Sequence, residues 1–461
     1  MPAPAWTPVI PEGPAPLYER LVAALRADIA SGALAAGARL PPQRDLAYRL
    51  GVGLGTVTRA YVEAEKAGLV SAHVGRGSFV NAPAAHRPLE RDGPVNLVQN
   101  IAPTAPAGTR LPEALARLRR RPDLLEHLAY APAAGHDAQR RAGAAWLARV
   151  GGFEGADWRR LVCCGGAQQA LALALGAVTR PGDTVLVEPA TYHGQKALAA
   201  HHGWRLKGVA MDEEGVRPDA LEAAARATGA RVLSILPTLQ NPTGRIMSLS
   251  RRQAIAAVAR AHDLIIVEDD IYAAYAPDAP PPFALIAPER TFHVSGVSKI
   301  LGPGLRAGYL VAPNQSLMER TLEAVRALNY APSGFGGLIA TQWIEDGSAE
   351  QVVAEIRDEM AVRQRMALDI LGGAVETPRT PYAPHLWLPM NELDAERVAG
   401  RALRGGVEVT PPDAPAVAPD LESGVRLCLG AAPDRETLRR ALGVVAGALS
   451  SEVAERSRAV V

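Results

Sequence analysis

The chain has few cysteines, no long apolar run and almost no net charge, and each shortage excludes a class of protein. Three cysteines, Cys163, Cys164 and Cys428, are too few for a disulfide framework and lack a metal-binding spacing. The longest apolar stretches, such as LIIV and TVLV, are far below the roughly 20 residues that cross a bilayer. We therefore expect no disulfide scaffold, no metal site and no membrane partner.

The beginning of the sequence shows no positively charged segment leading into a hydrophobic core, so no secretory signal is visible. Together with the cysteine usage, this predicts a cytoplasmic protein. The net charge is +1, so composition alone does not favour a polyanionic partner, and any nucleic-acid-binding surface is local.

Lysine is scarce, because the 49 basic residues include only Lys66, Lys196, Lys207 and Lys299. Arginine cannot replace an amine nucleophile, since its guanidinium stays protonated. Each retained lysine is therefore either an accident or a residue kept for its chemistry.

The first part of the chain has the pattern of a small helical domain. Residues 1–14 are rich in Pro and Ala and are expected to form a mobile lead-in. A helical apolar face begins at Leu17, and PPQRDLAYRLG follows as a short helix that Gly51 closes. The string GTVTRAYVEAEKAG predicts a further helix, with Thr56 as its N-cap and Gly68 as its stop.

A predicted hairpin follows these helices. The segment LVSAHVGRGSFV alternates in polarity and turns at Gly75-Arg76-Gly77. Two short helices about a tight turn, followed by a hairpin, are the outline of a winged helix-turn-helix. We place this α+β domain at residues 15–80.

The remainder has the pattern of an α/β domain. Residues 81–95 carry Pro, Gly and mixed charge without periodicity and are interpreted as a linker. From 96 to 461, short apolar runs (RLVCC, TVLVEP, RVLSILP, LIIVEDD, TFHVSG, AGYLVA) alternate with Ala- and Leu-rich helical stretches. Continuous apolar strands separated by helices indicate a mainly parallel sheet buried on both faces. Residues from about 340 to 461 are expected to form a smaller α+β lobe.

Polar residues cluster just after the apolar runs, where ligands gather in an open parallel sheet. After VCCGG, the backbone N–H groups of Gly166, Ala167 and Gln168 would face a phosphate at a helix N-terminus, although a glycine pair before a helix is commonly only a turn. Tyr192 follows the next strand and could stack on a planar ring or simply pack. Asn241 lies in NPTG, which is itself a common turn sequence.

Two further strand ends carry groups with stronger chemical demands. Asp269 and Tyr272 end an apolar strand, and a carboxylate buried there needs a positive or protonated partner. Ser298 and Lys299 follow another apolar strand, and Arg306 comes seven residues after Lys299. An ordinary surface lysine is the alternative for Lys299, but the scarcity of lysine and the apolar setting argue against it.

These sites occur in one order, each at a strand end, and together they match the needs of a pyridine aldehyde phosphate. Such a cofactor needs an amine for a Schiff base, an acid on the ring nitrogen, donors to the ring hydroxyl, a stacking face and a phosphate cup. The residues that supply these parts are, in that order, Lys299; Asp269; Asn241 with Tyr272; Tyr192; and Gly166, Ala167, Gln168, Ser298 and Arg306.

These strings carry a family resemblance that spans nearly the whole chain. Residues from about 100 onward resemble the fold-type I aminotransferases that use pyridoxal 5′-phosphate, especially their aminoadipate-aminotransferase-like branch, through NPTG, DDIY and SK…PGLRAGY. The N-terminal segment resembles the GntR winged helix, through PLYERLVAALRADIASGALAAGARLPPQRDLAYRLGV, TVTRAYVEAEKAGLV and GRGSFV. In tandem, they resemble the MocR family of transcriptional regulators.

The chain departs from this resemblance at three places. Gly296 stands three residues before Lys299, where many relatives have a Ser or Thr that contacts phosphate. The turn before Thr56 reads GVGLG, where relatives usually have polar and basic residues. The start of the large domain, VNLVQNIAPTAPAG, also matches the family poorly.

The resemblance also implies DNA contacts and a ligand contact. It places Arg39 and Arg44 beside the first motif helix and Arg59, with Thr56 and Thr58, on the recognition helix. It places Arg76 at the tip of the wing, although some of these arginines could be ordinary solvated ones. In the small lobe it assigns Arg426 to the α-carboxylate of an amino acid, for which a structural ion pair is the alternative. Tyr130 resembles a family tyrosine near the active site.

Two functions are consistent with these residues. The leading hypothesis is a homodimeric transcriptional regulator that binds a double-stranded DNA operator and senses an amino acid or amine through an external aldimine at Lys299. The alternative is a working aminotransferase in which Lys299 moves the proton and Asp269 supports the ring nitrogen. Retention of a coherent winged helix favours the regulator.

Overall fold

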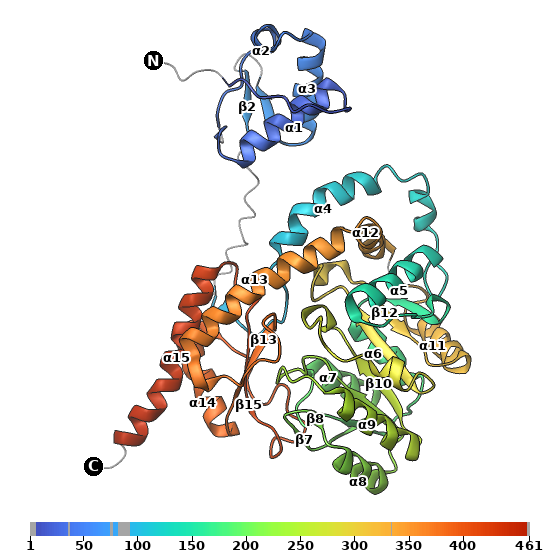
Figure 1. Ribbon diagram of the computed structural model, residues 1–461. Coiled ribbons are helices and arrows are strands. Elements are labelled where there is room, and N and C mark those ends of the chain that lie inside the picture. The colour runs from blue at the N-terminus through green and yellow to red at the C-terminus, as the bar shows by residue number, and fades with distance from the viewer. Residues whose placement is uncertain (1–5, 36, 74–76, 82–92, 333, 459–461) are drawn as a thin grey trace. The chain divides into compact units, whose positions relative to one another are not determined.

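The computed structural model describes residues 6–35, 37–73, 77–81, 93–332 and 334–458, and the chain divides into two compact units, Met1–Asp92 and Gly93–Val461 (Figure 1). Within the described ranges, no helix has both the length and the apolar character that a membrane span requires. Most of the linker predicted at 81–95 lies outside these ranges.

The first unit is a winged helix. Its elements are α1 (Leu17–Ala30), α2 (Gln43–Leu50), α3 (Leu54–Lys66), β1 (Val70–His73) and β2 (Gly77–Val80). The two strands pair antiparallel, as the alternation predicted. Leu21 and Leu25 of α1 are buried against Leu46 of α2 and Val57 of α3, so one apolar face per helix forms the core. Gly51 ends α2 with φ 64°, a backbone angle that favours glycine.

Two sequence-based expectations for this unit are wrong. Thr56 is not an N-cap: α3 begins at Leu54, Gly53 is its N-cap, and the Gly53 carbonyl accepts a hydrogen bond from the Thr56 amide at 3.0 Å. The lead-in is packed rather than mobile from Trp6 onward, because the Trp6 indole Nε1 donates to Asp28 at 2.8 Å and Ile10 packs against the core. An aromatic ring and a branched aliphatic side chain gain from burial that a Pro- and Ala-rich composition does not reveal.

The second unit is built on a seven-stranded sheet with the order β4-β12-β11-β10-β9-β5-β6. Its strands are β4 (Leu161–Cys164), β5 (Thr184–Val187), β6 (Arg205–Gly208), β9 (Val232–Ile235), β10 (Ile265–Asp269), β11 (Thr291–Gly296) and β12 (Gly308–Val311). Strand β12 is antiparallel to both neighbours, and the other pairs are parallel. The mainly parallel sheet is therefore confirmed, and all six predicted apolar runs are strands in it.

Both faces of the sheet are covered by helices because successive side chains of a buried strand point to opposite faces. Val185 and Val187 pack in one cluster with α6 and α11, whereas Leu186 between them packs in another cluster with α8 and α9. The helices of this unit that precede the small lobe are α4 (Ala105–Leu118), α5 (Asp137–Gly151), α6 (Ala167–Gly176), α7 (His193–His202), α8 (Pro218–Thr228), α9 (Leu249–Ala261), α10 (Phe283–Ile286), α11 (Gln315–Leu328) and α12 (Gly334–Glu345).

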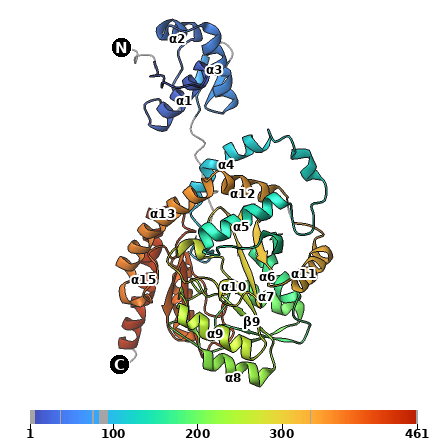
Figure 2. The same cartoon turned by 45° about the vertical axis from the view of Figure 1, so that its right-hand side comes forward.

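A smaller lobe follows in the chain. It contains α13 (Ser348–Leu371), β13 (His385–Pro389), α14 (Glu392–Arg404), β14 (Val407–Glu408), β15 (Gly424–Cys428) and α15 (Arg435–Arg458). Strands β13 and β15 pair antiparallel, and in both views α13 and α15 lie side by side along this pair (Figures 1 and 2). Strand β14 pairs in parallel with β3 (Val95–Asn96), so the beginning of the second unit is part of this lobe. The short strands β7 (Met211–Asp212) and β8 (Gly215–Val216) form a separate hairpin.

Candidate cofactor site and nucleic-acid interface

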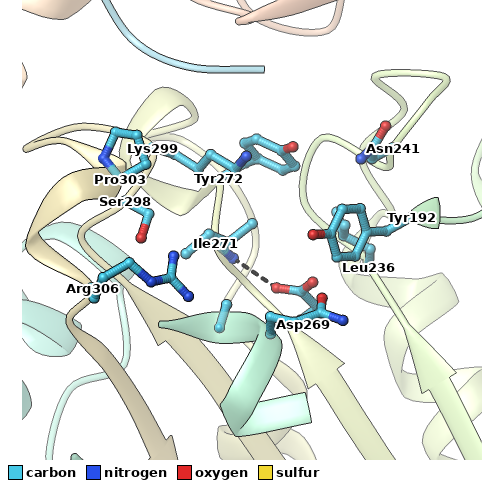
Figure 3. Close-up of a pocket in the computed structure, with 12 residues that line it drawn as sticks. Tyr192, Leu236, Asn241, Asp269, Ile271, Tyr272, Ser298, Lys299, Pro303 and Arg306 are labelled. Atoms are coloured by element: carbon cyan, nitrogen blue, oxygen red, sulfur yellow. Dashed lines mark hydrogen bonds between the residues drawn. The ribbon is translucent and has the colours of Figure 1, made fainter. Parts of the chain in front are cut away.

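The sheet brings the predicted cofactor residues to one edge. The carboxyl ends of the five parallel strands β4, β5, β9, β10 and β11 meet there, and the antiparallel β12 begins there. A cavity at this edge is lined by nine of the ten residues predicted to bind the cofactor, together with Leu236, Ile271 and Pro303. Figure 3 shows Tyr192 and Asn241 on one side of the cavity and Lys299, Ser298 and Arg306 on the other.

Lys299 follows β11 and enters the cavity beside Tyr272. Its Nζ donates a hydrogen bond to the Asn100 carbonyl at 2.7 Å and lies 5.8 Å from the centre of the Tyr272 ring. Burial lowers the pKa of the Lys299 amine, because a charged ammonium loses its hydration there. A lowered pKa increases the fraction of neutral amine, which is the form that attacks an aldehyde.

Asp269 ends β10 at the floor of the cavity and is 7% exposed. Its carboxylate accepts a hydrogen bond from the Ile271 amide at 3.3 Å, and no salt bridge joins it to a basic side chain in the described part of the chain. Burial raises the pKa of Asp269 to about 6. A protonated pyridine nitrogen in the cavity would supply the positive partner that this carboxylate lacks.

The ring hydroxyl and the ring face also have partners of the right chemistry. The buried Tyr272 hydroxyl accepts a hydrogen bond from Asn100 Nδ2 at 2.9 Å, which leaves its own hydrogen available. The Asn241 Oδ1 accepts from Arg426 at 2.6 Å, which leaves its amide hydrogens available. Tyr192 precedes α7 and is half-buried at the cavity wall.

The phosphate end is formed by the N-terminus of α6 and by Ser298 and Arg306. Within the described residues, the buried Ser298 hydroxyl and Gln168 Oε1 have no hydrogen-bond partner. An anion at this end would accept from the Ser298 hydroxyl, from the Arg306 guanidinium and from the first amides of α6. Gly166 does not line the cavity. It lies against Arg306, where a Cβ would come within 2.9 Å of the guanidinium. The residues present therefore fit a phosphorylated pyridine aldehyde.

The departure at Gly296 has a steric cause. A Cβ on Gly296 would lie 2.9 Å from the Ala307 carbonyl oxygen and 3.1 Å from the Cα of Gly308. A Cβ on Gly308 would in turn lie 2.6 Å from the backbone of Gly166. Strands β11 and β12 and the start of α6 therefore approach closely through glycines, and no side chain fits at position 296 without moving β12.

Arg426 lies in the middle of β15 and is buried beside Asn241. Its Nη2 donates to the Val98 carbonyl at 2.7 Å and to Thr410 Oγ1 at 2.9 Å, whereas its Nε has no partner among the described residues. Tyr130 lies elsewhere, 83% exposed, with its ring 4.8 Å from that of Tyr330. The structure of one chain therefore brings Arg426 to the site and leaves Tyr130 outside it.

Sequence reasoning missed two residues of the site, Asn100 and His385. The Asn100 Nδ2 donates to the Tyr272 hydroxyl and lies 2.8 Å from His385 Nδ1, while His385 Nε2 lies 3.0 Å from the Gln240 carbonyl. Asn100 belongs to the segment that matched the family poorly, and His385 is 285 residues away from it. No local pattern marks either residue.

In the winged helix, several predicted DNA-contacting residues lie on α2 and α3. Arg44 of α2 is exposed, and Thr58 of α3 donates to Gln43 at 2.8 Å. The Arg59 guanidinium lies 4.1 Å from the centre of the Tyr18 ring and donates to its hydroxyl at 3.3 Å, so α1 holds this side chain in place.

The remaining residues of this set are spread over the unit. Thr56 is half-buried in the first turn of α3. Arg39 is exposed, and its Nε lies 3.0 Å from the position that a Cβ would take on Gly77, in the strand pair nearest the turn of the hairpin. Arg76 lies outside the described residues.

Two family models match the chain. Residues 93–445 match aminotransferase class I and II, and residues 17–80 match the gntR family of bacterial regulatory proteins. The first match covers most of the chain. The cofactor of this family is pyridoxal 5′-phosphate, which agrees with the residues that line the cavity.

Relatives share this pairing of domains or the fold of the second unit. The HTH-type transcriptional regulator YdeF of Bacillus subtilis is 29% identical over 373 residues, 80% of each chain. The HTH-type pyridoxine biosynthesis transcriptional regulator PdxR of Corynebacterium glutamicum is 27% identical, over 81% of this chain and 82% of PdxR. The structure of LysN, the α-aminoadipate aminotransferase of Thermus thermophilus complexed with N-(5′-phosphopyridoxyl)-L-leucine, is similar with a TM-score of 0.68 and 25% identity, covering 79% of this chain and 94% of LysN. The chain thus belongs to the aminotransferase class I and II family and, with its gntR-family domain, has the architecture of the MocR transcriptional regulators.

Proposed function

We propose that the chain is a transcription regulator whose DNA binding changes when an amino acid or amine reaches the cofactor on Lys299. The observation that carries this proposal is the presence, in one chain, of a winged helix and of a cavity with an amine, a buried acid and, at the N-terminus of α6, a serine hydroxyl that is unpaired within the described residues. A protein that served only as an enzyme would have no use for the first of these units.

Pyridoxal 5′-phosphate supplies an aldehyde that captures amines and a ring that withdraws electrons from them. The chain supplies the rest. Lys299 would hold the aldehyde carbon through its amine, and Asp269 would keep a proton on the ring nitrogen. Tyr272 and Asn241 donate hydrogen bonds toward the ring oxygen, and Arg426 offers its guanidinium to the carboxylate of an amino acid.

A homodimer is the second part of the proposal. Exposed apolar side chains gather around η1 (Leu124–Leu128) and the junction of α11 with α12, and the ring contact between Tyr130 and Tyr330 joins the two regions. Leu125 is 77% exposed and Leu128 70% exposed. A second copy of the chain would cover this surface, and two winged helices would then meet two DNA half-sites.

The aminotransferase alternative is favoured by one observation, the simultaneous presence of Lys299 and Asp269 at the cavity. The lowered pKa of Lys299 suits a base as well as a point of attachment. Whether the chemistry stops after amine capture or proceeds to a keto acid separates the two functions.

The first experiment follows the visible absorbance of the purified full chain with pyridoxal 5′-phosphate while a panel of amino acids and amines is added. Keto acid release is assayed in parallel, as is binding to a DNA duplex that the protein selects from a random library. A band that shifts and then stops, without keto acid but with changed duplex affinity, supports the regulator. Formation of pyridoxamine phosphate with keto acid supports the aminotransferase. Duplex affinity that responds to none of the amines contradicts the regulator.

Two variants test the assignment of residues. Lys299→Ala is expected to abolish the visible band, and a retained band would remove Lys299 from its role. Arg44→Ala is expected to weaken duplex binding without affecting the band. The slope of log Kd against log salt concentration should fall by about one, as expected for the loss of one phosphate contact. Arg26→Ala is the matched control, because Arg26 is exposed on α1 outside the two motif helices. Equal duplex affinities of the two arginine variants would remove Arg44 from the interface.

A further inference from the structure

The first residues of the second unit contact side chains of the cofactor site. Val95 and Asn96 pair with Val407 and Glu408 of the small lobe. The Leu97 carbonyl then accepts a hydrogen bond from the Cys428 amide at 2.8 Å. This stretch is the beginning of the second unit, which follows the winged helix in the chain.

Two backbone carbonyls of this stretch accept hydrogen bonds from two functional side chains. The Val98 carbonyl accepts from Arg426 Nη2 at 2.7 Å, and the Asn100 carbonyl accepts from Lys299 Nζ at 2.7 Å. Both donors are the groups that the proposed function assigns to the ligand and the cofactor. A group that engages Lys299 or Arg426 would therefore compete with the carbonyls of this segment for the same hydrogens.

The Asn100 side chain has an orientation set by its neighbours. Burial lowers the pKa of His385 to about 3, so the ring is neutral, and the Gln240 carbonyl at 3.0 Å requires a hydrogen on Nε2. His385 Nδ1 is then an acceptor, and Asn100 Nδ2 donates to it and to the Tyr272 oxygen. With its oxygen occupied in this way, the Tyr272 hydroxyl directs its hydrogen elsewhere, toward the cavity.

We propose that Asn100 is a positioning residue of the cofactor site and that the segment Leu97–Asn100 reports the state of Lys299 and Arg426 to the chain leading to the winged helix. This inference rests on the proposed function and names the element through which the site acts. We assign this role to residues 93–100 because they pair with the small lobe and also accept hydrogen bonds from Lys299 and Arg426.

The signal at Asn100 follows from the hydrogens on Lys299. A free lysine amine has hydrogens to donate to the Asn100 carbonyl. When the amine condenses with the cofactor aldehyde, a carbon–nitrogen double bond replaces the carbon–oxygen double bond, and two amine hydrogens leave with the oxygen as water. The Asn100 carbonyl then loses its donor. An incoming amine takes the place of lysine on that carbon and its two hydrogens pass to Lys299, so the bond to Asn100 can form again.

The signal at Val98 follows from the geometry of the guanidinium. Both planar arrangements that bind a carboxylate by two hydrogen bonds use one hydrogen of Nη2, together with either Nε or Nη1. The two hydrogens of Arg426 Nη2 already go to Val98 and Thr410. A carboxylate bound in this way must therefore displace one of these acceptors, whereas an amine without a carboxylate leaves both in place.

The test is hydrogen–deuterium exchange of the full chain, followed in a peptide covering residues 93–101. The states compared are the apoprotein, the protein with pyridoxal 5′-phosphate, and the loaded protein with methylamine or glycine at concentrations where the visible band has stopped changing. We expect exchange to become roughly fivefold faster on loading and to slow again with methylamine, as one net hydrogen bond is lost and regained. The exchange rate with glycine should differ from the rate with methylamine, because only glycine has a carboxylate that displaces an acceptor of Arg426 Nη2. Equal exchange in all states overturns the inference.

Variants separate positioning from mere structural support. Asn100→Ala should retain a visible band but shift the pH at which that band changes, and Tyr272→Phe should shift it in the same direction because Asn100 acts through the Tyr272 hydroxyl. Residues 93–101 of Asn100→Ala should exchange fast in every state. Gln99→Ala is the matched control, because Gln99 is the exposed neighbour in the same segment. If Asn100→Ala does not fold, Asn100→Asp keeps the shape, and it replaces the two N–H donors by a carboxylate oxygen that also carries a negative charge. An Asn100 variant with the spectrum and the exchange of Gln99→Ala overturns the positioning role.

Duplex binding distinguishes failure of this inference from failure of the proposed function. If the wild-type affinity for the selected duplex does not respond to any amine, the proposed function fails, whatever the exchange data show. If wild type responds, Asn100→Ala should show a response to amine at least fivefold smaller than that of wild type. A full response in Asn100→Ala overturns the coupling role while leaving the regulator intact.

Discussion

Replacement of Asp269 by asparagine should stabilise the protein without cofactor and remove the advantage that the cofactor brings. The carboxyl is buried, and burial raises its pKa from 3.8 to about 6. A carboxyl with a raised pKa holds its proton more tightly in the folded chain than in the unfolded chain. Its contribution to stability is therefore most favourable below pH 3.8 and is lost as the pH rises through about 6.

The size of this loss follows from the shift. About two pKa units correspond to about 3 kcal/mol above pH 6. Asparagine keeps an oxygen that accepts from the Ile271 amide but carries no charge, so it avoids this cost. For a unit of this size, with an unfolding entropy of about 2.1 cal/mol/K per residue, 3 kcal/mol corresponds to about 4 °C in Tm.

The assay is calorimetry of the apoprotein at pH 4 and pH 8. Asp269→Asn should melt about 4 °C above wild type at pH 8 and together with it at pH 4. Addition of pyridoxal 5′-phosphate at pH 8 should raise the Tm of wild type more than the Tm of Asp269→Asn, because only the carboxylate of Asp269 pairs with a protonated ring. Asp263→Asn, at an exposed site, is the control. Equal Tm values for wild type and Asp269→Asn at pH 8 would refute the reasoning.

Two further substitutions test the packing around the site. Gly296→Ser should destabilise the second unit by about 1–3 kcal/mol and weaken cofactor binding, because its Cβ meets the Ala307 carbonyl at 2.9 Å; calorimetry against Gly373→Ser, where a Cβ meets open space, checks this, and equal Tm values would contradict it. Arg245→Met should cost up to about 3 kcal/mol, because it leaves Glu376 and Glu422, each 2.7 Å from the guanidinium, half-buried without a positive partner. Adding Glu376→Gln and Glu422→Gln should restore part of the Tm, and failure to do so would show that the loss was not electrostatic.

Local patterns in the sequence were sufficient for most of the elements. A strand buried on both faces must be apolar throughout, so the runs from Leu161 to Val311 were visible as strands, and the polar residues that follow them marked the ligand edge. Strand β6 was missed because it is an edge strand whose exposed Arg205 and Lys207 interrupt the apolar run, whereas β4 at the other edge is buried throughout. The N-cap of α3 was misplaced for a different reason, since Gly53 caps the helix through its backbone alone.

The sequence by itself therefore determined which side chains are candidates for the chemistry, because candidates are chosen by residue type and by position at a strand end. Lys299, Asp269, Asn241 and Arg306 could be selected in this way. Only the tertiary structure decided which groups support them. Asn100 contacts Lys299 across 199 residues, and His385 contacts Asn100 across 285. Such contacts depend on how the small lobe and the start of the second unit pack against the sheet edge, and the spacing of residues along a chain does not encode distances between segments that only folding brings together.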